Sequence, residues 1–239
     1  MDTTKPNLGI VCAASNPHTL QCCLLTSPAL HDAKLPIVVV YGAPNAAEAL
    51  QTAYASRFEV DWWIWAHQDV TLPEDWFENF HIQLALALDL WPDLAAVSNY
   101  GLDASGTRAG IVLDRGELLQ EDTALPCLAR SFDEHLIALK ANAGLHFDPE
   151  LGFDLYGTDL VLSAEQSGLQ SAVLPLYCEH WSSTPKHPPF PRALVSRYLK
   201  SATYFEQKWQ ASLPIASPHM SFYSPGSART QCNAFPVVD

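Results

Sequence analysis

The chain has little positive charge. Of its 239 residues, 13 are Lys or Arg and 26 are Asp or Glu, which gives a formal net charge of −13. Proteins that bind nucleic acid present basic surfaces that neutralise phosphates and release counterions. The composition therefore predicts no nucleic-acid partner. It also implies that a bound phosphate group would need help from a cation or from backbone N–H groups.

Long hydrophobic runs are also missing. No stretch approaches the roughly 18 consecutive apolar residues of a membrane span, and the start, MDTTKPNLGIVCAASN, has no basic segment followed by an apolar one. A secretory signal would show both features. We therefore expect no membrane span and a cytoplasmic protein. The six cysteines have no CxxC spacing, which predicts buried free thiols rather than disulfides or a zinc site.

Apolar residues make up 48% of the chain, enough for a sizeable core. The short apolar runs at 8–14, 36–41 and 62–66 are typical of strands buried on both faces of a sheet. Between them, 18–30 and 44–58 have the composition of helices. The order β-α-β-α-β predicts a doubly wound α/β domain.

The rest of the chain continues the alternation as far as His180. Segment 74–91 repeats large apolar residues every four positions, which predicts an amphipathic helix. The other expected elements are strands at 95–101, 109–114 and 135–141, a helix from about 158 to Gly168, a strand over 171–181, and a helix at 192–209. We expect one main domain, residues 1–183, and a helical or irregular C-terminal appendage, residues 184–239, packed on it.

Polar side chains follow three of the predicted strands. Ser15 and Asn16 follow the first, His67 and Asp69 follow the third, and His180 ends the last. In open α/β sheets, ligands bind at the carboxyl ends of the strands. Asp69 and His180 are therefore predicted ligands of Mn²⁺ or Mg²⁺. His67 is either a third ligand or a residue that supports the site.

Four segments together carry a family resemblance: HQDVTLPEDW, FDEHLIAL, LHFDPELGFDLYGTDLVLSAEQSGL and CEHWSS. In this order they resemble the glycosyltransferase-like family related to the streptomycin-biosynthesis protein StrF, within family 2 of the GT-A-fold glycosyltransferases. The resemblance covers about residues 8–183. It implies a GT-A fold, which is a Rossmann-like, mostly parallel sheet flanked by helices.

The resemblance also implies roles for individual residues. A nucleotide-sugar site is expected at Ser15, Asn16, Gln68 and Asp69. The family's Asp-x-Asp motif, which holds a diphosphate through a divalent metal, falls on HQD. Asp69 matches its metal-binding aspartate, and His67 replaces the other acid.

Two acids are candidates for the base that would deprotonate the acceptor hydroxyl. A Glu-Asp pair is expected where this chain has Tyr156 and Gly157, which leaves Asp154 and Asp159 as candidate bases. Asp159 would also suit the N-terminus of a helix for electrostatic reasons. The remaining candidates for the acceptor pocket are Asp133, Glu134 and Tyr156, although the two acids would equally suit salt bridges at a strand edge.

The sequence thus predicts a metal-assisted, inverting glycosyltransferase that moves a sugar from a UDP-, GDP- or dTDP-linked donor to a hydroxyl group. The departures from Asp-x-Asp and Glu-Asp keep a second hypothesis open, an inactive domain that binds a nucleotide sugar or a partner protein. A nucleotidyltransferase ranks third, because CAASNPHT after the first strand lacks the Gly and Lys of a phosphate loop.

Overall fold

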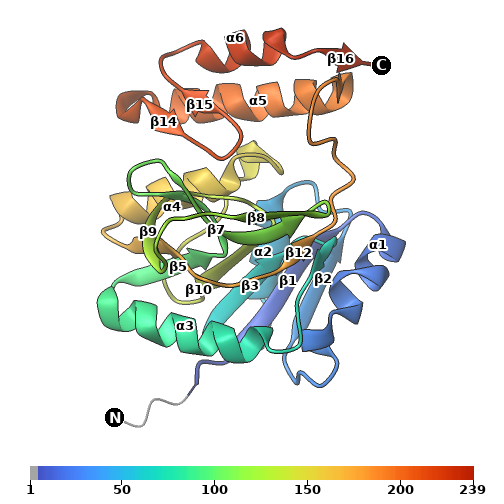
Figure 1. The fold of residues 1–239 in the computed structure, drawn as a ribbon, viewed down its shortest axis with the longest axis vertical. Helices are drawn as coiled ribbons and strands as arrows, with labels where there is room; N and C mark the ends of the chain where they lie inside the picture. Colours follow the sequence, from blue (N-terminus) through green and yellow to red (C-terminus); the bar gives the residue numbers. More distant parts are fainter. Residues whose placement is uncertain (1–4) are drawn as a thin grey trace.

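The computed structural model describes residues 5–239 and begins with the expected β-α-β-α-β unit. It consists of β1 (Leu8–Ala14), α1 (Pro17–Cys22), β2 (Ile37–Tyr41), α2 (Ala46–Tyr54) and β3 (Trp62–Ala66). Strand β1 pairs in parallel with both β2 and β3 (Figure 1). The main sheet therefore starts as predicted. The first four residues of the expected 1–183 domain lie outside the described part.

The first two helices are shorter than expected. The helix predicted over 18–30 ends at Cys22 and gives way to 3-10 turns at Leu24–Thr26 and Pro28–Leu30. Pro28 explains the interruption, because the residue before a proline is disfavoured in the helical region, and Ser27 is extended at ψ 132°. In α2 the side chain of Asn45 accepts the Glu48 N–H, so the helix begins after Asn45.

The sheet is mixed rather than mostly parallel. Its order is β2-β1-β3-β10-β5-β11-β9-β6-β7-β12-β4, with β8 paired to β7. Strand β10 is antiparallel to β3 and β5, and short connections join several later strands, which forces antiparallel pairing because a parallel neighbour needs a long crossover. The strands not yet bounded are β4 (Val70–Thr71), β5 (Leu94–Ser98), β6 (Tyr100–Asp103), β7 (Arg108–Asp114), β8 (Glu117–Gln120), β9 (Cys127–Phe132), β10 (Leu136–Lys140), β11 (Gln170–Val173) and β12 (Glu179–His180).

The strand expected over 171–181 is split in two. Strand β11 ends at Val173 and pairs with β5 and β9, whereas β12 pairs with β7 and β4. Pro175 lies between them, and a proline cannot donate a hydrogen bond to a neighbouring strand. The break lets the chain leave one part of the sheet and bring His180 to another.

Strand β3 lies at the centre of the core, with all five side chains at most 2% exposed. Trp62, Ile64 and Ala66 face the layer of α1 and α3 (Trp76–Leu90). Trp63 and Trp65 face the opposite layer, which contains α2 and α4 (Tyr156–Gln166). Burial on both faces explains why this strand is apolar throughout instead of alternating.

The C-terminal residues form a further layer beyond α4 (Figure 1). It contains β13 (Phe190–Pro191), α5 (Arg192–Lys208), β14 (Ile215–Ala216), β15 (Ser221–Phe222), α6 (Ser227–Ala234) and β16 (Val237–Val238). Phe205, Trp209 and Phe222 belong to the same apolar cluster as Tyr156 and Leu160 of α4. The C-terminal layer therefore shares the core of the main domain. In residues 5–239 no helix is long and apolar enough to cross a membrane.

We expect replacement of Lys208 by Met to destabilise the protein by about 3 kcal/mol, because it leaves a buried carboxylate without its counter-charge. The Lys208 ammonium lies 2.7 Å from both Asp148 and Asp159, and the Asp159 side chain is only 2% exposed. Urea unfolding would measure the loss. Lys200→Met on the exposed side of α5 is the matched control, and equal losses in the two variants would contradict the prediction.

Candidate functional site

The pairing of two short strands brings His180 next to the end of β3. Strand β4 follows the His67-Gln68-Asp69 turn and pairs with β12, with His180 opposite Val70. The Trp181 N–H also donates to the Asp69 carbonyl at 2.8 Å. Residues more than 110 positions apart in the sequence thereby meet at the carboxyl edge of the sheet, where the strand-end pattern predicted a site.

Three potential metal-ligand atoms converge at this edge. His180 Nε2 lies 3.6 Å and His67 Nδ1 lies 4.0 Å from Asp69 Oδ1. All three atoms lie within 4.8 Å of one another. Asp69 Oδ1 and His180 Nε2 are buried and have no hydrogen-bond partner among residues 5–239. Buried polar atoms without partners are costly, so this cluster is suited to an ion.

Hydrogen bonds on its far side orient the His67 ring. The Tyr156 hydroxyl donates to the Glu134 carbonyl at 2.9 Å and accepts the Trp65 indole N–H at 3.0 Å. Its single hydrogen is then used, so the 2.7 Å contact with His67 Nε2 requires the histidine to donate. This assignment leaves the Nδ1 lone pair free to face Asp69.

His67 is held neutral. About a third of its side chain is accessible, but only from the floor of a cavity, and protein surrounds the rest. Burial lowers the pKa of His67 to about 4, and the nearby His180 and His135 act in the same direction against the opposing effect of Asp69. A neutral imidazole is the form that binds a metal.

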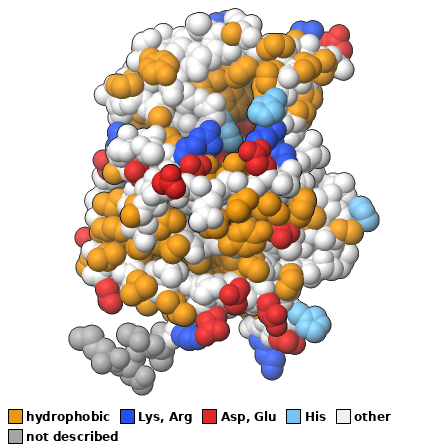
Figure 2. Space-filling model, viewed as in Figure 1, with side chains coloured by type: hydrophobic (Ala, Val, Ile, Leu, Met, Phe, Trp, Pro, Cys, Tyr) orange, Lys and Arg blue, Asp and Glu red, His pale blue; other side chains and the backbone are white. Residues whose placement is uncertain are grey.

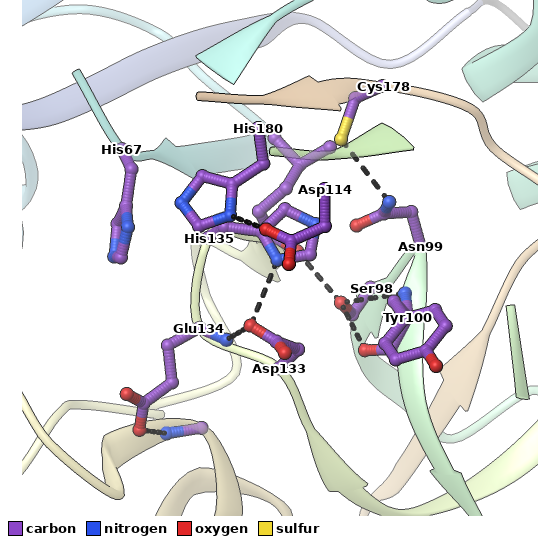
Figure 3. Close-up of polar contacts among 12 residues, drawn as sticks. His67, Ser98, Asn99, Tyr100, Asp114, Asp133, Glu134, His135, Cys178 and His180 are labelled. Carbon is purple, nitrogen blue, oxygen red and sulfur yellow. Dashed lines mark hydrogen bonds and ion pairs between the residues drawn. The ribbon is translucent and has the colours of Figure 1, made fainter. Parts of the chain in front are cut away.

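His180 is oriented in the same way by Asp114 at the end of β7. Its Nδ1 lies 3.0 Å from Asp114 Oδ1 (Figure 3). Its Nε2 is therefore left to face Asp69 Oδ1, 3.6 Å away. Burial alone would raise the pKa of Asp114, but hydrogen bonds from His180 and Arg115 outweigh it and lower the pKa to about 2. A carboxylate that binds the far nitrogen of a histidine is the usual support of a metal ligand.

The residues present therefore fit a divalent cation. Two imidazole nitrogens and one carboxylate oxygen lie close together, and contacts on the far side orient both imidazole rings. Imidazole ligands suit transition metals better than Mg²⁺, so this set of side chains fits a transition-metal dication. Residues His67, Asp69 and His180, all predicted from the sequence as ligands, are the three that the fold brings together.

A cavity of about 550 Å³ opens above these residues, between the main domain and the C-terminal layer. Figure 2 shows a hollow at this level with basic, acidic and histidine side chains around its rim. The main domain contributes a polar floor and α5 contributes much of the opposite wall. The charged and histidine residues that line it are His67, Arg108, Asp114, Arg115, Asp133, Glu134, His135, Asp154, His180, Lys186, His187, Arg197 and His219.

The acids predicted for catalysis lie in different environments. Asp154 lines the cavity, but Arg197 donates to both of its oxygens, at 3.0 and 2.8 Å. Asp159 lies outside the cavity lining, because the Trp209 indole N–H donates to it at 2.8 Å and Lys208 covers it. Tyr156 also lies behind the wall, where its ring packs against Trp65 and Phe147.

The two acids predicted for the acceptor pocket both line the cavity. Burial would raise the pKa of Asp133, but His135, whose Nδ1 lies 2.9 Å from its carboxylate, more than compensates and holds that pKa well below its usual range. For Glu134, burial and the neighbouring Asp154 carboxylate raise the pKa well above its usual value. Only the Gly157 N–H donates to the Glu134 side chain among the described residues, at 3.2 Å.

The residues predicted for the nucleotide sugar form one connected group beside Asp69. The Gln68 side-chain oxygen accepts the backbone N–H groups of Ser15 and Asn16 at 3.0 and 2.9 Å, and its amide nitrogen donates to the Ser15 hydroxyl. The Asn16 side chain also caps α1. The ends of β1 and β3 are thus tied together.

Asp114, Arg115 and His135 were not among the site residues predicted from the sequence. Asp114 ends the predicted strand 109–114, so the strand-end rule would have found it if the position of that strand had been known. His135 stacks on His180 with ring centroids 4.9 Å apart. It follows two acids in FDEH, where no pattern separates a site residue from a surface one.

Comparisons with known proteins were made at the levels of sequence and structure. The sequence matches no family model and no curated protein. The fold is similar to that of the mannosyltransferase PcManGT from Pyrobaculum calidifontis in complex with GDP-Man and Mn²⁺, with a TM-score of 0.54, 14% identity, and coverage of 97% of this chain and 70% of that one. It is also similar to GalNAc-T7 with UDP, GalNAc and Mn²⁺, with a TM-score of 0.52 and 11% identity.

These similarities establish the architecture. The chain spans half the length of GalNAc-T7, of which it covers 50%, while 87% of this chain is matched. Its mixed sheet and flanking helices are those of GT-A glycosyltransferases, which confirms the expected fold class. Membership of the StrF-related family stays a prediction.

We expect Mn²⁺ to raise the melting temperature of the protein. At 100 times its dissociation constant, a ligand of the native state adds about 2.7 kcal/mol, or roughly 5–10 °C for a domain of this size. Asp69→Asn removes the central ligand and should abolish the shift. Asp89→Asn, an exposed acid on α3, is the control and should keep it. A shift that persists in Asp69→Asn would place the ion elsewhere.

Proposed function

We propose that this protein is a glycosyltransferase that moves a sugar from a nucleoside-diphosphate donor to a hydroxyl acceptor with inversion at the anomeric carbon. The observation behind the proposal is the convergence of His67 Nδ1, Asp69 Oδ1 and His180 Nε2 at the carboxyl edge of a GT-A-like sheet. His67 and His180 also line a cavity of about 550 Å³. The GDP-Man and Mn²⁺ named for one similar structure, and the UDP, GalNAc and Mn²⁺ named for the other, support the same chemistry.

The three ligands would hold a divalent cation against the diphosphate of the donor. When bound, the cation stabilises the negative charge that grows on the leaving phosphate, as a Lewis acid. The nucleoside is proposed to lie beside β1 and β3, where Ser15, Asn16 and Gln68 form the connected group. The protein contributes position, because it fixes Asp69 and both imidazoles before the donor arrives.

Glu134 is the acid best suited to take the proton of the acceptor hydroxyl. Both oxygens of Asp154 already accept hydrogen bonds from Arg197, and Asp159 is covered by Lys208. Glu134 lines the cavity, and a raised pKa makes a carboxylate a stronger base near neutral pH. We therefore propose Glu134, rather than Asp154 or Asp159, as the general base.

Donor binding tests the function. We expect UDP-, GDP- or dTDP-sugars to raise the melting temperature in the presence of Mn²⁺, and the favoured nucleotide to do so much less for Asp69→Asn. Incubation with the favoured donor should then release nucleoside diphosphate, measured by a coupled assay. Stabilisation without any release would favour the alternative, an inactive domain that binds a nucleotide sugar. Failure of all three nucleotides to bind would contradict both.

Replacement of Glu134 by Gln separates catalysis from stability. We expect turnover to fall by roughly 10²–10⁴-fold, the usual contribution of a general base. The raised pKa of Glu134 means that the folded state favours its protonated form, so ionisation costs stability as pH rises above the unfolded-state value. At pH 8 the free energy of unfolding of Glu134→Gln should therefore equal or exceed that of the wild type.

The control for this variant is Glu165→Gln, the same change at an exposed site that pairs with Arg130. Donor-induced melting shifts should be unchanged in both variants. The wild-type turnover rate should rise with pH as Glu134 ionises. Full turnover in Glu134→Gln, or a flat pH profile for the wild type, would transfer the role of the base to another group.

A further inference from the structure

The hairpin between β7 and β8 is closed by an unusual turn. Asp114 pairs with Glu117, so Arg115 and Gly116 alone form the loop, with φ of 51° and 82°. A two-residue turn with positive φ at both positions prefers Asn-Gly or Gly-Gly. An arginine at the first position is strained, because its Cβ crowds the neighbouring carbonyl in the left-handed region, whereas Asn and Gly tolerate this conformation. The contacts of the arginine side chain are therefore expected to compensate for the backbone strain.

The side chain of Arg115 makes three hydrogen bonds in two directions. Its Nε and Nη2 both donate to Asp114 Oδ2, at 2.9 and 2.6 Å. Its Nη1 donates to the Thr184 carbonyl at 2.8 Å, and its backbone N–H donates to the His180 carbonyl at 2.8 Å. Thr184 belongs to the segment 181–189, which leads from β12 to the C-terminal layer and contributes Ser182, Thr184 and Lys186 to the cavity wall.

The two oxygens of Asp114 are divided between two partners. Oδ2 accepts from Arg115, while Oδ1 accepts from His180 Nδ1. The guanidinium therefore fixes the plane of the carboxylate, and the carboxylate fixes both the orientation and the tautomer of His180. With the hydrogen on Nδ1, the lone pair of Nε2 faces Asp69.

We propose that Arg115 is a positioning residue that acts through Asp114 to present His180 Nε2 to the cation and fastens segment 181–189 to the same point. The cation site is the one in the proposed function, on which this inference rests. The left-handed conformation directs the side chain back over Asp114, whereas the residues usual in this turn are too short to reach both Asp114 and Thr184. The turn links the metal ligand to the wall of the substrate cavity.

Arg115→Asn is the sharpest test, since Asn tolerates the turn but lacks the guanidinium fork. We expect Mn²⁺ affinity, measured on the full chain without any sugar nucleotide by electron paramagnetic resonance of free Mn²⁺, to fall by roughly 10–100-fold. The melting temperature of the metal-free protein should fall, because the buried Asp114 carboxylate loses the guanidinium that pairs with it. Arg130→Asn, the same change at a cation on β9 that pairs with exposed Glu165, should leave the affinity unchanged.

A second measurement does not depend on the metal. Long-range ¹H–¹⁵N spectra of the metal-free protein should show His180 with its hydrogen on Nδ1 in the wild type and a mixture of tautomers in Arg115→Asn. The His180→Gln spectrum would assign the signal. If the wild type binds no Mn²⁺, the proposed function fails, while the tautomer measurement still decides the role of Arg115.

Two results would overturn the inference. One is an unchanged Mn²⁺ affinity in Arg115→Asn, and the other is an unchanged His180 tautomer. If Arg115→Asn does not fold, Arg115→Lys serves in its place, because it keeps the charge and loses the fork. The Arg115→Lys protein should then bind Mn²⁺ more weakly than the wild type. Equal binding would show that the guanidinium fork has no positioning role.

Discussion

The site depends on keeping protons off three atoms that face one another. A histidine binds a metal only through an unprotonated nitrogen, and each imidazole has two candidates. In this fold a hydrogen bond on the far side of each ring makes the choice: His67 Nε2 donates to the Tyr156 hydroxyl, and His180 Nδ1 donates to Asp114. The first support comes from α4 and is fixed by Trp65 of β3, and the second comes from β7. The orientation of the two imidazole rings therefore depends on helix α4, on the core strand β3 and on strand β7 in the far half of the sheet.

Charge in the cavity suggests why the proposed diphosphate donor would need a cation. The lining includes four basic side chains, Arg108, Arg115, Lys186 and Arg197, and four acidic ones, Asp114, Asp133, Glu134 and Asp154. Arg115 and Arg197 are paired with Asp114 and Asp154, and Lys186 is paired with Glu117. Little positive charge is left over for a diphosphate, and the net charge of the whole chain, −13, repels one. In the proposed function, a cation beside Asp69 would supply the missing positive charge.

Local patterns predicted the part of this arrangement that depends on local structure. The apolar run 62–66 predicted a buried strand, and the rule that ligands lie at strand ends then singled out Asp69 and His180. Contacts that depend on the order of distant strands in the sheet could not be predicted from the sequence. The mixed sheet, the insertion of β10 between β3 and β5, and the pairing of β12 with β7 decide that Asp114 lies behind His180. For the same reason the sequence did not show that Glu134 lines the cavity, nor that the C-terminal layer covers Asp159.

The C-terminal layer is better described as half of the substrate cavity than as an appendage. Helix α5 provides Arg197 and Tyr198, and the loop between β14 and β15 provides Pro218, His219 and Met220. The layer is held by a shared apolar core and by Lys208 between Asp148 and Asp159, so its position relative to the main domain is fixed. The main domain supplies the cation ligands and the proposed base, and both would serve any acceptor. In the proposed function, discrimination between acceptors would therefore fall to the wall that this layer builds, because that wall would meet the acceptor without taking part in the chemistry.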